Sequence, residues 1–471
     1  MQRLNASFRD PSGYIFLHEG TIYRRVNSSY AAQYDQLLRS GLYDALVEKK
    51  WLVTHEEVDT ESLPGHADAH CLLRPEPIPY ISYPYEWCFS QLKDAALLTL
   101  KIAAQALQRD MVLKDASAYN VQFIGHRPVF IDTLSFEAYK DGAPWVAYRQ
   151  FCQHFLAPLA LMAHGHASLG QLLCTHIDGI PLEIAASLLP LRTRLHSGLY
   201  THIHLHAKTQ QRFANAAADK KPEASTKAPF ISKKALRAIL ESLAMTVQKL
   251  VWQLPKTEWG SYYEATSYSA DAADNKADLI GEMLASLNRP IAVCHDLGAN
   301  RGRYSEVAAK HCVHVISQDI DPVAVESQYR ERKTSGPDNI LPLLQNLTAP
   351  SPAIGWRNRE RDCFAHRARC DAVLALALVH HLAISNNTPM SEIAGFFYDL
   401  APHLIIEFVP KADSQVKRML ATREDIFPDY SEVGFEVAFT EFFEILHKAK
   451  VRNSERTLYL MIRRPSPSLR P

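Results

Sequence analysis

The sequence predicts an α/β protein whose C-terminal half is a doubly wound, mostly parallel seven-stranded sheet with an antiparallel edge strand. Short apolar runs alternate with helical patterns over 291–409, which is typical of a parallel sheet with helices on both faces. A turn containing two glycines follows the first of these runs. Two further apolar runs, separated by only a few residues, close the chain, and such a hairpin requires one antiparallel strand at that edge.

Each strand of this half is expected where mostly apolar residues are bounded by polar or turn residues. The runs are 291–296, 313–319, 339–345, 371–379, 403–409, 442–451 and 456–464. Helical patterns fill the first two intervals, with SEVAAKHC after the first run and 321–333 after the second. This order of elements predicts that the carboxyl ends of the strands meet at one edge of the sheet.

The chain of 471 residues is longer than one hydrophobic core usually serves, so two domains are expected. Residues 207–230 are rich in Ala, Lys and Pro and carry little apolar periodicity, which indicates an exposed flexible linker. We therefore expect an N-terminal α+β domain over 1–206, a bridging helix over 231–255 and the sheet domain over 256–471.

The charge balance excludes some partners. Lys+Arg and Asp+Glu number 51 each, so bulk nucleic-acid binding is not expected.

The chain carries no apolar stretch fit to span a membrane, and its first residues do not resemble a signal peptide. The eight cysteines are scattered without a C-x-x-C pair, which predicts reduced thiols and a cytoplasmic location.

Three alternating histidines, His202, His204 and His206, are expected on one face of a strand. They have no fourth ligand or carboxylate nearby, so the sequence predicts no metal site there.

The turn Asp296–Gly302 is the first candidate for ligand binding. In an open α/β sheet, ligands bind beyond the carboxyl ends of the strands, and glycines there allow a tight turn and close approach of a ligand. Asp319 ends the second predicted strand, where a carboxylate can accept hydrogen bonds from both hydroxyls of a ribose.

With this loop, the acidic second strand and the closing hairpin, 256–471 resembles the class I S-adenosylmethionine-dependent methyltransferases. The resemblance implies S-adenosyl-L-methionine as cofactor and Asp319 as the ribose ligand. It implies that the methionine part of the cofactor is surrounded by Asp296, Gly298, Asn300 and Gly302. Asn346 stands where the family often has an Asp near the adenine.

A nicotinamide-binding Rossmann unit is the main alternative, since it also has an acid after its second strand. Its fingerprint is G-x-G-x-x-G, in which the second glycine admits a pyrophosphate. Asn300 occupies that position here, and the alternative leaves the closing hairpin unexplained. The methyltransferase interpretation is therefore favoured.

The fourth predicted strand brings His380 and His381 to the same edge of the sheet. A neutral histidine is a suitable base near pH 7, so both are candidate catalytic residues, with His381 preferred; packing against the adjacent loop is the alternative. Glu407, at the end of the fifth strand, is either a site residue or a buried ion-pair partner. Lys276 lies in the segment that precedes the sheet.

In the N-terminal half, Asp115, Asn120 and Asp132 have a spacing that resembles the catalytic loop and metal-binding acid of the protein-kinase-like fold. The expected histidine before the first acid is Leu113, and no glycine follows Asp132. A glycine-rich phosphate loop and a convincing strand lysine are also missing from the sequence. A degenerate kinase-like domain that binds a substrate or nucleotide fits these features better than an active phosphotransferase.

As a whole, the chain resembles a bacterial group of two-domain proteins, one of which is linked to host-specific nodulation. The stretches SFRDPSGYIF, LKDASAYN and ALVHHLAISNN carry this resemblance. Three functions are considered: a methyltransferase whose N-terminal domain recognises a small-molecule or glycan acceptor, a bifunctional or phosphotransferase-type enzyme, and an inactive binding module. The motifs identify neither the acceptor nor the oligomeric state.

Overall fold

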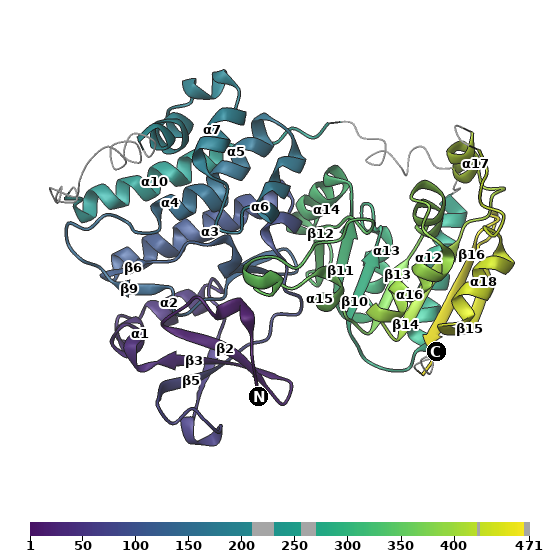
Figure 1. Ribbon diagram of the computed structural model, residues 1–471, viewed down its shortest axis with the longest axis horizontal. Coiled ribbons are helices and arrows are strands. Elements are labelled where there is room, and N and C mark those ends of the chain that lie inside the picture. Colours follow the sequence, from purple (N-terminus) through teal and green to yellow (C-terminus); the bar gives the residue numbers. More distant parts are fainter. Residues whose placement is uncertain (210–229, 256–269, 422–423, 466–471) are drawn as a thin grey trace. The chain divides into compact units, whose positions relative to one another are not determined.

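The computed structural model describes residues 1–209, 230–255, 270–421 and 424–465. The chain divides into two compact units (Figure 1). Unit 1 consists of Met1–Phe123, Arg127–Gln253 and Ala353–Asp362, and unit 2 of Ile124–His126, Leu254–Pro352 and Cys363–Pro471. Most of the predicted linker, 207–230, lies outside the described residues.

Among the described residues of unit 2, seven strands form one sheet in the order β12-β11-β10-β13-β14-β16-β15. Their bounds are β10 Ile291–Leu297, β11 Cys312–Asp319, β12 Ile340–Leu344, β13 Ala372–Ala375, β14 His403–Phe408, β15 Phe443–Lys450 and β16 Thr457–Arg463. The first five strands are parallel to one another, and β10 lies between β11 and β13. The predicted mostly parallel, seven-stranded sheet is confirmed.

The closing hairpin refines that prediction. β16 is the antiparallel strand, and it lies one position in from the edge because it pairs with both β14 and β15. The strand at the edge is β15, where the register shifts between Ile445 and His447. Such a bulge bends an edge strand and makes it a poorer template for pairing with another chain.

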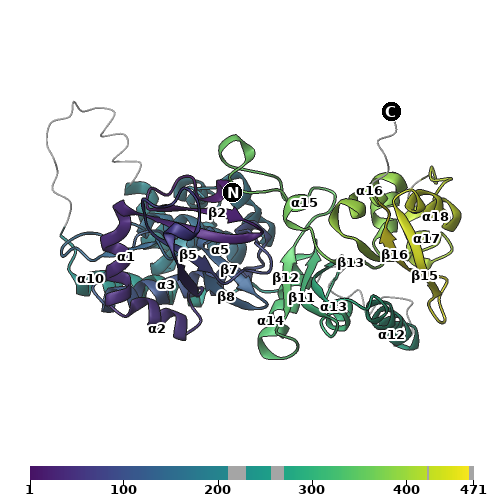
Figure 2. The same ribbon diagram turned by 90° about the horizontal axis from the view of Figure 1, so that it is seen from below.

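Helices cover both faces of this sheet (Figure 2). They are α12 Ala270–Ser286, α13 Arg303–Ala308, α14 Pro322–Thr334, α15 Phe364–Arg367, α16 Met390–Leu400, α17 Ser414–Leu420 and α18 Glu432–Thr440. One core joins α15, α16 and α18 to the sheet, and a second core joins α12 and α13 to its other face. Successive residues of β13 serve opposite cores: Val373 packs in the first and Leu374 in the second. This two-sided burial explains why the strands read as continuous apolar runs.

Unit 1 is an α+β unit. Its described strands include an antiparallel five-stranded sheet in the order β1-β2-β3-β5-β4. The bounds are β1 Gln2–Arg3, β2 Gly13–His18, β3 Thr21–Asn27, β4 His55–Val58 and β5 Ala69–Pro75. Two short pairs are added by β6 Met111–Leu113, β7 Val121–Ile124, β8 Arg127–Phe130 and β9 Phe136–Ala138.

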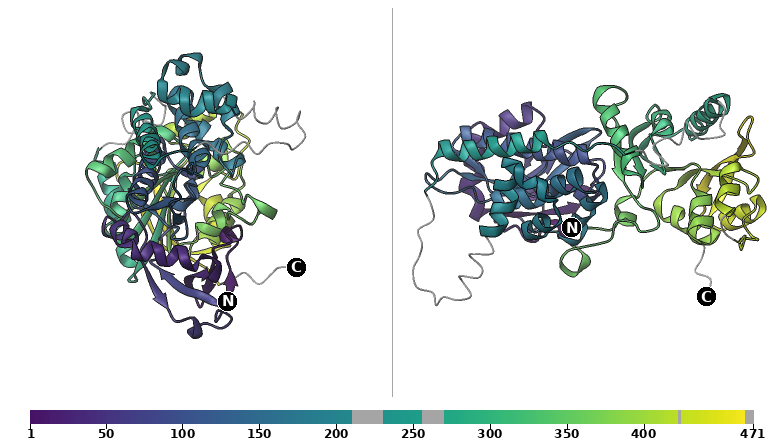
Figure 3. Two further views of the ribbon diagram at one scale, coloured as in Figure 1. Left: turned by 90° about the vertical axis from the view of Figure 1, so that its left-hand side faces the viewer. Right: turned by 90° about the horizontal axis from the view of Figure 1, so that it is seen from above.

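The helices of unit 1 are mostly gathered beside this sheet, as the purple strands and the blue to teal helices show (Figure 3). They are α1 Ala31–Arg39, α2 Leu42–Glu48, α3 Phe89–Gln108, α4 Tyr148–Phe151, α5 Ala157–His164, α6 Leu172–Thr175, α7 Leu182–Leu188, α8 Ser197–Leu199 and α10 Lys233–Lys249. The helix expected to bridge the domains is α10. It lies in unit 1, where Lys93 of α3 donates to the carbonyls of Gln248 and Leu250 at 2.8 Å each.

The prediction of a strand through the three histidines is wrong. Residues Tyr200–Leu205 form a π-helical turn after α8, and His202 is buried there with its ring nitrogens bonded to Tyr148 and Ser242. The alternation of three histidines is too short to distinguish a strand from a helix segment. The contacts of His202 with distant residues stabilise the helical turn instead.

Residues Ala353–Asp362 follow β12 of unit 2 in the chain but belong to unit 1. Arg9 holds this segment through Glu360, with 2.9 Å between Nε and Oε1. Glu360 is 5% exposed and also accepts the N–H of Trp356. The sequence contains no signal for this excursion, because the residues are polar and lack a repeating pattern.

Candidate active site

A cavity of about 340 Å³ opens at the carboxyl ends of β10, β11, β12 and β13 in unit 2. This volume lies in the range of small-molecule sites. Its wall contains Gly298, Asn300, Asp319, Ile320, Gln345, Asn346, Leu347, Thr348, Leu376, Ala377, Leu378, His381, Leu382, Ser385 and Asn386. The structure therefore brings five of the sequence-predicted site residues to one place: Gly298, Asn300, Asp319, Asn346 and His381.

Asp319 is fixed by the backbone of two loops. Its carboxylate accepts the N–H of Asn300 at 2.7 Å and the N–H of Asp321 at 2.9 Å. The two bonds use different oxygens, so each oxygen keeps a lone pair for a ligand hydroxyl. Burial raises the pKa of Asp319 to about 6, although these two N–H groups oppose the shift.

Asp296 and Gly302 lie behind the cavity and shape the loop. Asp296 accepts the hydroxyl of Ser305 at 2.6 Å, which ties the end of β10 to α13. Burial raises the pKa of Asp296 to about 6, against the effects of Ser305 and Lys276. Gly302 has a φ of 78°, and a Cβ there would lie 2.6 Å from Nε2 of Gln328, so no other residue fits without strain.

The two adjacent histidines have different surroundings. His381 lines the cavity and begins a π-helical turn, His381–Ser385, a feature often found at functional sites. Burial and the nearby Arg456 lower the pKa of His381 to about 4, so it is neutral at pH 7. His380 is fully buried and is not part of the cavity wall, and neither of its ring nitrogens has a hydrogen-bond partner among the described residues.

Glu407 is completely buried at the end of β14. Its carboxylate accepts Nζ of Lys276 at 2.6 Å and the N–H of Ala377 at 2.7 Å. Ala377 has a φ of 49°, a conformation that costs free energy for a residue with a Cβ, and it lines the cavity. The ion pair therefore links α12 to the strained backbone that forms the cavity wall, and Glu407 acts on this wall from behind.

The cation side of this cluster is buried as well. Lys276 is 2% exposed, and burial lowers its pKa while Glu407 opposes that shift. Arg456 lies 3.9 Å from Glu407 and donates from Nε to Asp413 at 2.8 Å. Removing any one of these charges would leave its partner buried without a counter-ion and without water to solvate it.

Most of the apolar wall of the cavity was not predicted from the sequence. Ile320 follows Asp319 directly and is 58% exposed, which is unusual for a large aliphatic side chain placed after a buried strand. Leu347 and Leu378 also line the cavity, each three residues after the end of its strand, β12 and β13. An apolar residue one to three positions after the end of each strand was the available signal.

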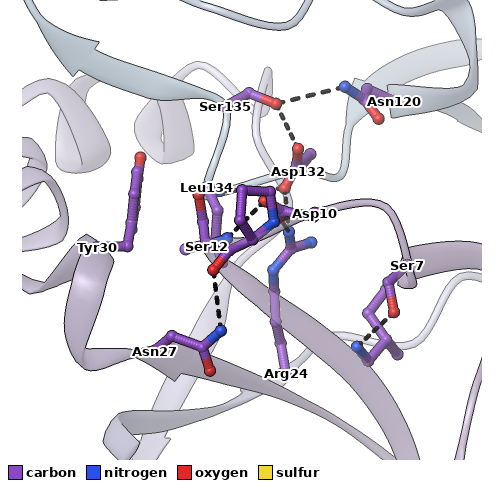
Figure 4. Close-up of polar contacts among 12 residues, drawn as sticks. Ser7, Asp10, Ser12, Arg24, Asn27, Tyr30, Asn120, Asp132, Leu134 and Ser135 are labelled. Atoms are coloured by element: carbon purple, nitrogen blue, oxygen red, sulfur yellow. Dashed lines mark hydrogen bonds and ion pairs between the residues drawn. The ribbon is translucent and has the colours of Figure 1, made fainter.

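The three predicted residues of the N-terminal half also come together. Burial and the charge of Asp132 raise the pKa of Asp115, against the hydrogen bonds from Gln150, at 2.8 Å, and from Asn120. Asn120 donates to Ser135 at 3.3 Å, and Ser135 donates to Asp132 (Figure 4). Asp132 is engaged by Arg24 at 2.6 Å, and the same guanidinium contacts Asp10 at 3.0 Å.

No family model matches the chain. The chain is 37% identical over 461 residues to the nodulation protein NoeA of Rhizobium meliloti (strain 1021), and the match covers 97% of this chain and 95% of that protein.

Among solved structures, the N-methyltransferase NodS of Bradyrhizobium japonicum WM9 in complex with S-adenosyl-L-homocysteine is similar over 44% of this chain and 99% of its own, with 11% identity and a TM-score of 0.31. The magnesium protoporphyrin IX methyltransferase ChlM of Synechocystis PCC 6803 with bound S-adenosylhomocysteine matches 44% of this chain and 93% of its own, with 17% identity and a TM-score of 0.30.

We expect Lys276→Met to destabilise unit 2 by about 3–5 kcal/mol, because it leaves the buried Glu407 without its closest cation. Adding Glu407→Gln should recover part of this loss, since the amide oxygen still accepts the N–H of Ala377. Free energies of unfolding from urea titrations followed by circular dichroism measure both effects. Lys448→Met, which breaks an exposed pair with Glu436, is the control and should cost about 1 kcal/mol or less. If the double variant lost the sum of the unfolding free energies lost by the two single variants, the coupling of Lys276 with Glu407 would be contradicted.

Proposed function

The chain belongs to the family of the nodulation protein NoeA, and we propose that it is an S-adenosylmethionine-dependent methyltransferase acting on a small-molecule or glycan acceptor. One observation carries the proposal. The buried carboxylate of Asp319 ends the second strand and faces a cavity whose other wall is the glycine loop of the first strand. A cofactor with a ribose and a flexible charged tail fits this combination of groups.

Different residues of the cavity wall suit different parts of the cofactor. Asp319 has the free lone pairs to accept both ribose hydroxyls. Ile320, Leu347 and Leu378 offer apolar contact to a flat base, and Asn346 stands beside them with its Oδ1 turned to the N–H and hydroxyl of Thr348. Gly298 and Asn300, both at positive φ, leave the backbone open to the methionine part.

S-adenosylmethionine, when bound, supplies a methyl group activated on a sulfonium. The chain's own task is to align the acceptor and to receive a proton from an acceptor hydroxyl or amine. We assign that task to His381, which is neutral at pH 7 and lines the cavity. Its low pKa makes it a weak base, so alignment through a hydrogen bond is the larger part of its role. His380, buried away from the cavity, supports the turn.

Asp319→Asn should weaken the binding of S-adenosylhomocysteine by about 2 kcal/mol, roughly thirtyfold, because a charged acceptor is replaced by a neutral one. Calorimetric titration of the purified protein measures this. Asp338→Asn is the matched control, since that exposed carboxylate of unit 2 lies outside the cavity wall. Equal affinity in wild type and Asp319→Asn would remove Asp319 from the site.

The affinity for S-adenosylhomocysteine should also fall as the pH drops below about 6. The free protein holds Asp319 with a pKa near 6, and both ribose hydroxyls donate more strongly to the ionised carboxylate than to the protonated acid. The affinity is therefore highest above that pKa, and it weakens by up to about tenfold per pH unit below it. In Asp319→Asn this dependence should disappear, and its persistence there would assign it to Asp296 instead.

We further propose that unit 1 recognises the acceptor. It contains a separate cavity of about 780 Å³, large enough for a sugar or a molecule of similar size.

A second candidate function, phosphoryl transfer in unit 1, is favoured by the convergence of Asp115, Asn120 and Asp132 on this cavity. It requires that Asp132 exchange Arg24 for a metal ion. If this function holds, Mg-ATP binds to the wild type in a calorimetric titration and the binding is lost in Asp132→Ala but kept in Asp338→Asn. Absence of Mg-ATP binding rules the second function out.

A further inference from the structure

The cavity of unit 1 is bordered by many charged side chains, and several of them are joined in ion pairs. Arg24 lies between Asp10 at 3.0 Å and Asp132 at 2.6 Å (Figure 4). Arg9 lies between Glu360 at 2.9 Å and Asp178 at 3.4 Å. These six groups form two clusters, in each of which one arginine lies between two carboxylates.

Arg361 differs from these arginines. Its Nη1 donates to two backbone carbonyls, those of Ala6 at 3.1 Å and Glu360 at 3.0 Å. The adjacent carboxylate of Glu360 is engaged by Arg9, and Arg361 forms no ion pair among the residues that the structure describes. Its Nε is buried without a hydrogen-bond partner there. Arg361 thus brings to the cavity wall a guanidinium that forms no ion pair with the described residues.

Two buried side chains stand next to this guanidinium. The guanidinium carbon of Arg361 lies 4.4 Å from the ring centroid of Tyr119, and the Tyr119 ring meets that of His154 edge to face at 6.1 Å. Tyr119 is 8% exposed and His154 is 2% exposed, and both line the cavity. Oη of Tyr119 and Nδ1 of His154 have no partner within the described part of the chain.

The charge of Arg361 acts on both of these rings. Burial and the charge of Arg361 together lower the pKa of His154 to about 3. Burial raises the pKa of Tyr119, and the charge of Arg361 opposes this rise. At neutral pH the group therefore consists of one cation, one phenol and one neutral imidazole.

We propose that Arg361, Tyr119 and His154 form an oxyanion subsite in the cavity of unit 1, which takes a carboxylate or phosphate group of a small-molecule ligand. A guanidinium N–H, a phenolic O–H and an imidazole N–H can all donate to the oxygens of one such group. Leaving three buried polar atoms without partners is costly, and an anionic ligand satisfies them together. The subsite stands independently of methyl transfer; only the identification of its ligand as the methyl acceptor rests on the proposed function.

The test uses the full-length protein and two probes, inorganic phosphate and malonate, titrated at constant ionic strength with thermal unfolding as the readout. We expect at least one probe to raise the unfolding temperature, with a dissociation constant that increases about tenfold or more in Arg361→Met. Tyr119→Phe, which removes a single hydroxyl, should weaken the same probe about fivefold. Arg237→Met, which alters an exposed arginine of α10 in the same unit, is the control and should leave binding unchanged.

The outcomes are distinct. Tighter binding of phosphate indicates a phosphorylated ligand, and tighter binding of malonate indicates a carboxylate. Stabilisation that is unchanged in both Arg361→Met and Tyr119→Phe, or no stabilisation by either probe, would overturn the subsite. Binding of S-adenosylhomocysteine, measured in parallel, should be unaffected by both variants, so a failure here is separable from a failure of the methyltransferase proposal.

Discussion

The parallel pairing of β10 with β11 on one side and β13 on the other is the constraint on which the cofactor cavity depends. Asp296 lies opposite Ser317 and Leu374 in this ladder, so the ends of three strands are set by one register. A slip of one residue would turn every side chain of β10 to the other face and move Asp319 away from the glycine loop. The continuous apolar sequence of these strands holds the register, because both faces are packed in cores.

Charge burial is the cost of this arrangement. Asp296, Asp319 and Glu407 all lie at or near full burial behind or beside the cavity. They are tolerated because each accepts hydrogen bonds from fixed donors: the hydroxyl of Ser305, the backbone of the glycine loop and the ammonium of Lys276. The same bonds remove freedom from the loops that they join. The donors that stabilise the buried carboxylates therefore also hold the loops of the site in place.

The sequence was a good guide where a local pattern has one physical meaning. Apolar runs and the Asp296–Gly302 turn predicted the sheet and the position of the cavity, because strand burial and positive φ leave few alternatives. It was a poor guide where distant segments decide. Lys276 could not be paired with Glu407 from spacing, and His380 and His381 look equivalent in the chain although only His381 reaches the cavity. The helix at His202 and the role of Arg361 likewise depend on partners far away in sequence.

The chain leaves unit 2 at Ala353 and returns at Cys363, and the hairpin tip Ile124–His126 is counted with unit 2 in exchange. A single cut in the chain therefore does not separate the two units. Recombination within the linker would join the Tyr119 of one lineage to the Arg361 of another, and a fragment ending at Gln253 would lack part of its own cavity wall. An exchange of either half at the linker would therefore also replace part of the cavity wall of unit 1.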